Sequence, residues 1–154
     1  MQNATNAFFA GGSTGPALVD TIDYFTMASV ADSTDHGDLG ETRAWCSGGN
    51  DLSYGYVAGG EPSPGLNIMR YPFTSSGGSA DVGEISTQGS NAASRTVSST
   101  TAGYIFGGNN GSPRGTDTIQ KYTFASPSTA SDQGEIIIPS GPPQHYYSQA
   151  GVQV

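Results

Sequence analysis

Acidic residues recur in pairs that could hold a metal ion. In each pair an aspartate is followed by one variable residue, a glycine and a second acid. The three pairs are Asp35/Asp38, Asp81/Glu84 and Asp132/Glu135. Oxygen ligands at a tight turn suit calcium, but Ca²⁺ takes about six to eight of them, more than one pair supplies. The alternative is that the aspartate caps the turn, the glycine takes a positive φ and the second acid faces water.

Four aromatic side chains could stack on sugar rings. They are Trp45, Tyr54, Tyr146 and Tyr147. Aromatic faces suit the C–H surfaces of a sugar, although packing in a protein core is the more common fate of such residues. We therefore keep glycan binding and core packing open for these four.

The chain has few residues that could carry out other kinds of catalysis. A copper site of the galactose-oxidase kind needs histidines together with a tyrosine and a cysteine. The two histidines, His36 and His145, stand at non-equivalent positions, and Cys46 is the single cysteine. The chain has no Gly-x-Ser-x-Gly nucleophile elbow with a plausible order of Asp and His, and no glycine loop followed by Lys-Ser or Lys-Thr. We expect no enzyme activity and no cofactor.

Composition excludes further classes of partner. The net charge is −8, with only 5 Lys and Arg in 154 residues. Nucleic acids and anionic membrane surfaces need clustered cations, so neither is an expected partner. No apolar segment approaches the length of a membrane span. The 8 Tyr and 6 Phe recur regularly, which favours a folded chain over a disordered one.

Double glycines mark three copies of one unit. They are Gly11-Gly12, Gly59-Gly60 and Gly107-Gly108, and both 59 − 11 and 107 − 59 equal 48. A short apolar run precedes each pair, which indicates a strand that enters a turn. Glycine there avoids a side chain near a crowded axis and permits positive φ.

Two further anchors follow each double glycine. The first begins at Ile22, Ile68 or Ile119 and continues at the third position after it with Phe25, Tyr71 or Tyr122. The second is the acidic turn, whose aspartate keeps the same separation from the isoleucine in every copy, since 35 − 22, 81 − 68 and 132 − 119 agree. The alternation of apolar residues indicates strands, and no helical period appears.

A fourth, weakly matching segment closes each unit. It covers residues 43–46, 93–97 and 145–148. Four strands in a period near 48 are typical of a β-propeller blade. The sequence thus predicts one all-β domain over residues 1–154, with blades at about 7–53, 54–101 and 102–149. Residues 150–154 match the start of a further first strand, and we expect either a clasp to another subunit or a frayed tail there.

The repeated motifs resemble a known family of repeats. Gly-Tyr-(Val/Ile)-(Ala/Phe)-Gly-Gly, Ile-x-(Arg/Lys)-Tyr-x-Phe and Asp-x-Gly-Glu-Ile are similar to the kelch-like repeats of marine bacteriophage structural and tail-fibre proteins, often grouped with galactose-oxidase propellers. The similarity covers about residues 7–149, and the first copy departs from it at Phe25, Met27 and Asp38. It implies a virion component such as a fibre, appendage or capsid-decorating protein.

Three blades are fewer than the roughly four to eight of a closed propeller. We therefore expect the chain to associate with itself as a dimer of six blades, and a three-sheet prism or a trimer built on another axis is the alternative. The resemblance adds other virion proteins and host-surface glycans as expected partners. A free carbohydrate-binding module is the alternative function.

Overall fold

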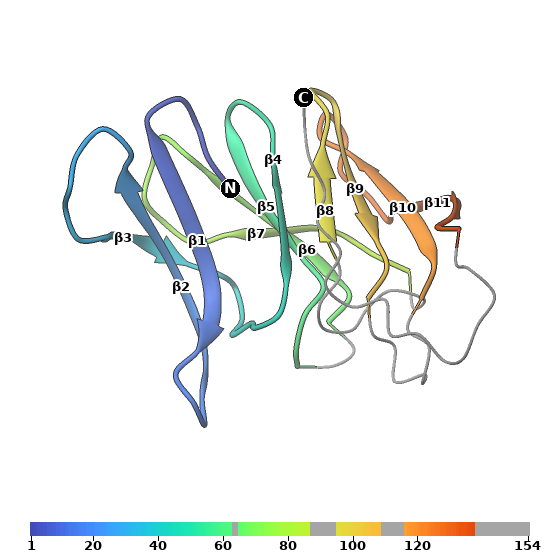
Figure 1. Cartoon of the computed structure of the whole chain (residues 1–154), viewed down its shortest axis with the longest axis horizontal. Coiled ribbons are helices and arrows are strands. Elements are labelled where there is room, and N and C mark those ends of the chain that lie inside the picture. Colours follow the sequence, from blue (N-terminus) through green and yellow to red (C-terminus); the bar gives the residue numbers. More distant parts are fainter. Residues whose placement is uncertain (63–64, 87–94, 109–115, 138–154) are drawn as a thin grey trace.

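The chain forms three antiparallel β-sheets that stand side by side (Figure 1). This computed structural model describes residues 1–62, 65–86, 95–108 and 116–137. The first sheet holds β1 (Asn6–Ser13), β2 (Leu18–Thr26) and β3 (Thr34–Asp38). The middle sheet holds β4 (Ser47–Asn50), β5 (Tyr54–Ala58), β6 (Asn67–Pro72) and β7 (Ala80–Glu84). The third sheet holds β8 (Arg95–Ser98), β9 (Ala102–Phe106), β10 (Thr118–Thr123) and β11 (Ser131–Glu135).

The predicted all-β class is confirmed, with 11 strands in sheets of three, four and four across the described ranges. In all three sheets the strands pair in sequence order with their neighbours, as short turns between antiparallel strands require. No helix occurs in the described ranges, and therefore none there has the length and apolarity to cross a membrane.

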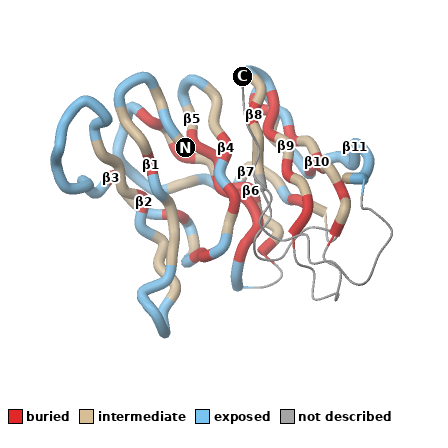
Figure 2. The backbone as a smooth tube through the Cα atoms, viewed as in Figure 1, coloured by how far each residue is buried: buried red, intermediate tan, exposed pale blue. Residues whose placement is uncertain are grey.

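The middle sheet is covered on both faces (Figure 2). Tyr56, Val57 and Ala58 follow one another on β5, and each is at most 1% exposed. Because successive side chains of a strand point to opposite faces, such a run needs a neighbour on each side. The middle sheet therefore supplies a separate surface to each of the two hydrophobic cores.

One core lies at each junction between sheets. The core between the first and middle sheets comprises Phe8, Ile22, Leu39, Val57, Met69, Tyr71 and Phe73. The core between the middle and third sheets comprises Tyr56, Ala58, Ile68, Ile85, Ile105, Tyr122, Phe124 and Ala130. Aromatic rings dominate both, and each buried ring contributes a large apolar area.

The three sheets, taken in order, form a stack, and the burial of each anchor residue depends on the place of its sheet in that stack. Ile22 and Ile68 are completely buried because each faces the following sheet, whereas Ile119 is half-buried. Conversely, Tyr71 and Tyr122 are buried against the preceding sheet, but Phe25 on the first sheet is half-buried. The repeat thus predicts which face a residue occupies, while its position at an end of the stack decides its exposure.

All six glycines of the double-glycine pairs have positive φ. Gly11, at φ 69°, also packs so closely that a methyl group there would lie 2.4 Å from the Arg43 carbonyl oxygen. The Gly12 amide donates a 2.6 Å hydrogen bond to that oxygen. Positive φ therefore occurs at every position of the pairs, and close backbone approach occurs at Gly11 and at Gly60, where a methyl group would lie 2.5 Å from the Ala44 carbonyl oxygen.

The ends of the first two units were placed wrongly from the sequence. Residues 43–46 do not form a named strand, and Ser47–Asn50 (β4) pairs with β5 as the first strand of the middle sheet. Likewise, β8 is the first strand of the third sheet. The sheets therefore depart from the predicted blade limits of 7–53 and 54–101, because the strand near the end of each range belongs to the sheet after it. The predicted end of the blade at 102–149 lies outside the described residues.

The beginning of the chain shows the same offset. Gln2 forms a bridge with Ala7, and Asn50 pairs with Gly55 in the same way one repeat later, since 50 − 2 and 55 − 7 both equal 48. Met1 and Gln2 thus stand where the end of β4 stands in the middle sheet. The predicted strand at residues 150–154 and the third closing segment at 145–148 lie outside the described residues.

Candidate functional site

The aspartates of the three acidic pairs cap β-bulges. Asp35 accepts a 2.9 Å hydrogen bond from the Gly37 amide through Oδ1. Equivalent bonds join Asp81 to Gly83 at 3.2 Å and Asp132 to Gly134 at 2.8 Å. The strand register shifts beside each of these turns. The turn-capping interpretation accounts for the first acid of every pair.

The second acids, Asp38, Glu84 and Glu135, are exposed at the ends of their strands. The described ranges contain no group of three or more His, Cys, Asp or Glu residues placed to hold a metal ion. Asp81 already uses Oδ2 to accept a 2.9 Å bond from Asn67 Nδ2. The calcium candidates therefore stay separate turns, each with fewer oxygens than the ion coordinates.

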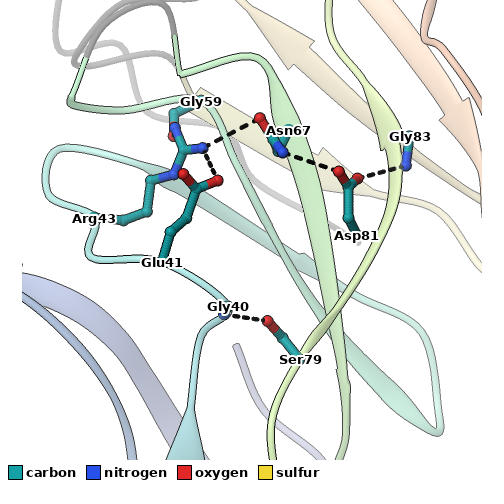
Figure 3. A network of polar contacts seen from close by, with 8 residues as sticks. All are labelled: Gly40, Glu41, Arg43, Gly59, Asn67, Ser79, Asp81 and Gly83. Carbon is teal, nitrogen blue, oxygen red and sulfur yellow. Dashed lines mark hydrogen bonds and ion pairs between the residues drawn. The ribbon is translucent and has the colours of Figure 1, made fainter.

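The buried Arg43 is part of a network of polar contacts beside the junction of the first two sheets, and the network's other polar side chains are partly or fully exposed (Figure 3). Its Nη2 donates to Glu41 Oε1 and, at 3.4 Å, to Asn67 Oδ1, and its Nη1 donates to the Gly59 carbonyl at 3.3 Å. Asn67 continues the chain of contacts to Asp81 on β7. One guanidinium thus joins the segment before β4, a double glycine and β6, which a planar fork of donors can do and a point charge cannot.

Arg43 was not singled out in the sequence analysis. A usable signal was present, because no other Lys or Arg precedes Arg70 in the sequence. An isolated cation in an apolar, glycine-rich stretch favours a buried and paired role, since charged groups are rarely buried unless paired. The Arg43 guanidinium contacts protein groups at three points, and these contacts hold the segment before β4 against the middle sheet.

The glycan candidates are not brought together in the described part of the chain. Trp45 is 57% exposed and has a positive φ of 53°. Tyr54 carries the Arg70 guanidinium 4.6 Å from its ring centroid and packs against the core. Tyr146 and Tyr147 lie outside the described residues. Of the two candidates that are described, Trp45 is exposed and Tyr54 is half-buried.

His36 and Cys46 are both enclosed by the junction between the first two sheets. His36 is buried, with Nε2 2.7 Å from the Pro72 carbonyl oxygen and with Phe8 and Tyr24 as aromatic neighbours. Cys46 is half-buried, and burial raises the pKa of its thiol. A thiol with a raised pKa is a weak nucleophile at neutral pH. His145 lies outside the described residues.

A groove opens beside His36 at the edge of this junction. It encloses about 360 Å³, and its lining includes Asn6, Tyr24, Asp35, His36, Thr74 and Ser76. Amide, carboxylate and hydroxyl groups stand next to aromatic rings there. This mixture of polar groups with aromatic surface is the chemistry that recognises sugars.

The chain matches no protein-family model and no curated protein.

Proposed function

We propose that the chain is a non-enzymatic structural repeat protein that works within a larger assembly, as a component of a bacteriophage virion. One observation carries the assembly role: the same kind of junction is made twice in one direction, which leaves one unmatched sheet face at each end of the described stack. The resemblance of the repeat motifs to kelch-like repeats of marine phage fibres supports the placement in a virion.

In this proposal the sheets are propeller blades, and three of them are part of a ring. A blade has too little apolar surface to fold by itself, so neighbours must cover both of its faces. Two chains would supply six blades. Display of many copies on one particle would then give strong attachment to a host surface, because many weak contacts form at the same time.

The proposed role is tested on particles rather than on the isolated chain. Antibodies raised against the purified protein are expected to decorate virions that carry this gene, and the chain should be found in purified particles in stoichiometric amount. Labelling of infected-cell lysate with none on the particles would overturn the virion role.

A carbohydrate-binding module is the second candidate, and the groove beside His36 favours it. A glycan array with the purified chain tests this function. Thr74→Arg would fill the groove from an exposed position, and it should abolish binding that depends on the groove. Leu52→Arg, at a fully exposed site elsewhere, is the matched control. Binding that survives Thr74→Arg would exclude the groove as its site.

A further inference from the structure

The two internal junctions are built in the same way. At the first, the Phe8 ring packs on Phe73, with centroids 4.6 Å apart, and on Tyr71 at 5.9 Å. At the second, Tyr56 packs on Phe124 at 4.6 Å and on Tyr122 at 5.7 Å. Phe8 and Tyr56 occupy the same position of successive repeats, since 56 − 8 equals the period of 48, so one repeat position packs on two rings of the following sheet at both junctions.

Backbone contacts repeat in the same direction. The Asp38 carbonyl accepts a hydrogen bond from the Ser79 amide at 2.9 Å, and the Glu84 carbonyl accepts one from Ala130 at 2.7 Å. In each case the acidic turn of one sheet receives an amide from the turn before the last strand of the next. A junction therefore has two distinct sides, one supplied by each sheet.

The third sheet presents the first of these sides without a described partner. Tyr104 occupies the repeat position of Tyr56, one unit further along the chain, and it is half-buried together with Phe106, Ile119 and Ile136. The equivalent residues of the middle sheet, Tyr56, Ala58, Ile68 and Ile85, are at most 1% exposed. A methyl group on Gly134 would meet nothing within 4 Å, whereas one on the equivalent Gly83 would collide with Ser128.

The first sheet presents the opposite side. Phe9 is 56% exposed and Met27 is 44% exposed, and Phe25 stacks on Phe9 with centroids 5.7 Å apart. Phe25 and Met27 occupy the repeat positions of Tyr71 and Phe73, which receive the Phe8 ring at the first junction. The turn that would donate an amide, residues 28–33, is exposed throughout.

The charges on the two end faces are opposite. Asp23 lies directly across from Phe9 in the strand register, and Lys121 lies directly across from Tyr104. Residues that face each other across an antiparallel pair project from the same side of the sheet. The first sheet thus adds an acid to its outer face, and the third adds a base, a combination that favours their association and disfavours each face pairing with itself.

We infer that the outer face of the third sheet binds the outer face of the first sheet of a second copy of this chain. In this junction Tyr104 packs on the partner's Phe25 and the partner's Met27, and the Glu135 carbonyl accepts from the amide of the partner's Ser33. Gly134 then lies against the backbone of the partner's Ala31, as Gly83 lies against Ser128. The inference rests on the proposed assembly role and names its partner and its pairing.

A head-to-tail contact of this kind closes into a ring or continues as a filament. Two chains close the ring if six sheets complete a turn. Either product has the same junction, so the junction itself is what the experiment must detect.

Site-directed cross-linking tests the pairing. In a Cys46→Ser background, a Tyr104→Cys chain is mixed with a Met27→Cys chain and treated with a short bis-maleimide. A covalent product of two different chains is expected. The control mixes Tyr104→Cys with Leu52→Cys, because Leu52 is 93% exposed and lies on neither face. Equal yields from the two mixtures, or none from the first, would overturn the inference.

Sedimentation of the unmodified chain provides the second measurement. The expected mass is about twice the 15.7 kDa of one chain, or a concentration-dependent ladder of multiples if the ring stays open. Tyr104→Arg and Met27→Arg should each return the protein to single chains while circular dichroism shows the strands intact. A single-chain mass for the unmodified protein would overturn the pairing and leave the virion role to be judged by the antibody labelling of particles.

Discussion

Gly37 lies directly against the backbone of Gly77, so that a methyl group on Gly37 would stand 2.1 Å from the Gly77 carbonyl oxygen. The same relationship joins Gly83 to Ser128 at the next junction, where the corresponding distance is 2.5 Å. The glycine of each internal acidic turn is therefore a contact point between sheets as well as a turn residue. The stack depends on the absence of a side chain there.

Gly83→Ala is expected to destabilise the protein by roughly 1–3 kcal/mol, as overpacking of a close contact does. Gly83 does not have a positive φ, so the loss reports the collision with Ser128 and not backbone strain. Gly78→Ala is the matched control, because its methyl group would meet the Asp38 carbonyl oxygen at an ordinary 3.7 Å. Urea unfolding measures both, and similar midpoints for the two variants would contradict the assigned contact.

The sequence was sufficient for the central strands of each sheet, and insufficient for the first strands and for the grouping of strands into sheets. The double glycines and the anchor isoleucines predicted the central strands, because both signals are local. The fourth segment failed because β4 has the sequence Ser-Gly-Gly-Asn, which carries no apolar alternation. Its membership of the middle sheet depends on pairing with β5, which is tertiary information.

The exposure of the anchor isoleucines also could not be predicted from the sequence. Ile119 has the same local pattern as Ile22 and Ile68, yet it is half-buried where they are buried. The difference arises from the position of the third sheet at the end of the stack. For the acidic pairs, by contrast, turn capping could be argued in advance, because an aspartate two positions before a glycine bonds its amide locally.

Tyr122→Phe is expected to leave stability unchanged or to raise it by about 1 kcal/mol. The Tyr122 hydroxyl is buried and has no hydrogen-bond partner among the described groups, and such a group costs about 1–3 kcal/mol. Tyr56→Phe is the comparison, because the Tyr56 hydroxyl donates a 3.0 Å bond to Asp51 and its loss should destabilise by about 1 kcal/mol. Thermal unfolding of both variants gives the ranking, and a larger loss for Tyr122→Phe would show that its hydroxyl is paired in solution.

Alkaline pH should weaken the stack. Burial raises the pKa of Tyr71 and Tyr122 above the usual value of about 10, and burial with the nearby Asp51 carboxylate raises that of Tyr56. A raised folded-state pKa means that the folded protein holds the proton more tightly. The stability contribution is complete below about pH 10 and is lost as pH rises toward the folded pKa. The measurement is the urea midpoint between about pH 8 and about pH 11, a range that spans the unfolded tyrosine pKa. A midpoint that stays constant over this range would contradict the expected loss of stability.

Calcium should have no effect on stability. The described ranges hold no group of three or more His, Cys, Asp or Glu residues placed for a metal ion, and each acidic turn offers fewer oxygens than Ca²⁺ coordinates. The melting temperature is expected to be the same in excess Ca²⁺ and in a chelator. Asp81→Ala should instead cost about 1–2 kcal/mol under both conditions, since it removes the bonds from Gly83 and Asn67. A rise in melting temperature with Ca²⁺ that Asp81→Ala abolishes would restore the metal hypothesis.

The Arg43 network makes a prediction that separates shape from charge. Arg43→Lys keeps the charge, but an ammonium cannot reach Glu41, Asn67 and the Gly59 carbonyl together, so we expect a loss of about 2–4 kcal/mol. Glu41→Gln keeps an acceptor in place and changes a partly exposed carboxylate, whose pairing is screened by water, so about 1 kcal/mol or less is expected. Urea unfolding followed by the fluorescence of Trp45, which lies close to Arg43 in the sequence, measures both variants. If Glu41→Gln cost as much as Arg43→Lys, the local ion pair with Glu41 rather than the bonds to Asn67 and the Gly59 carbonyl would be the main stabilising contact of Arg43.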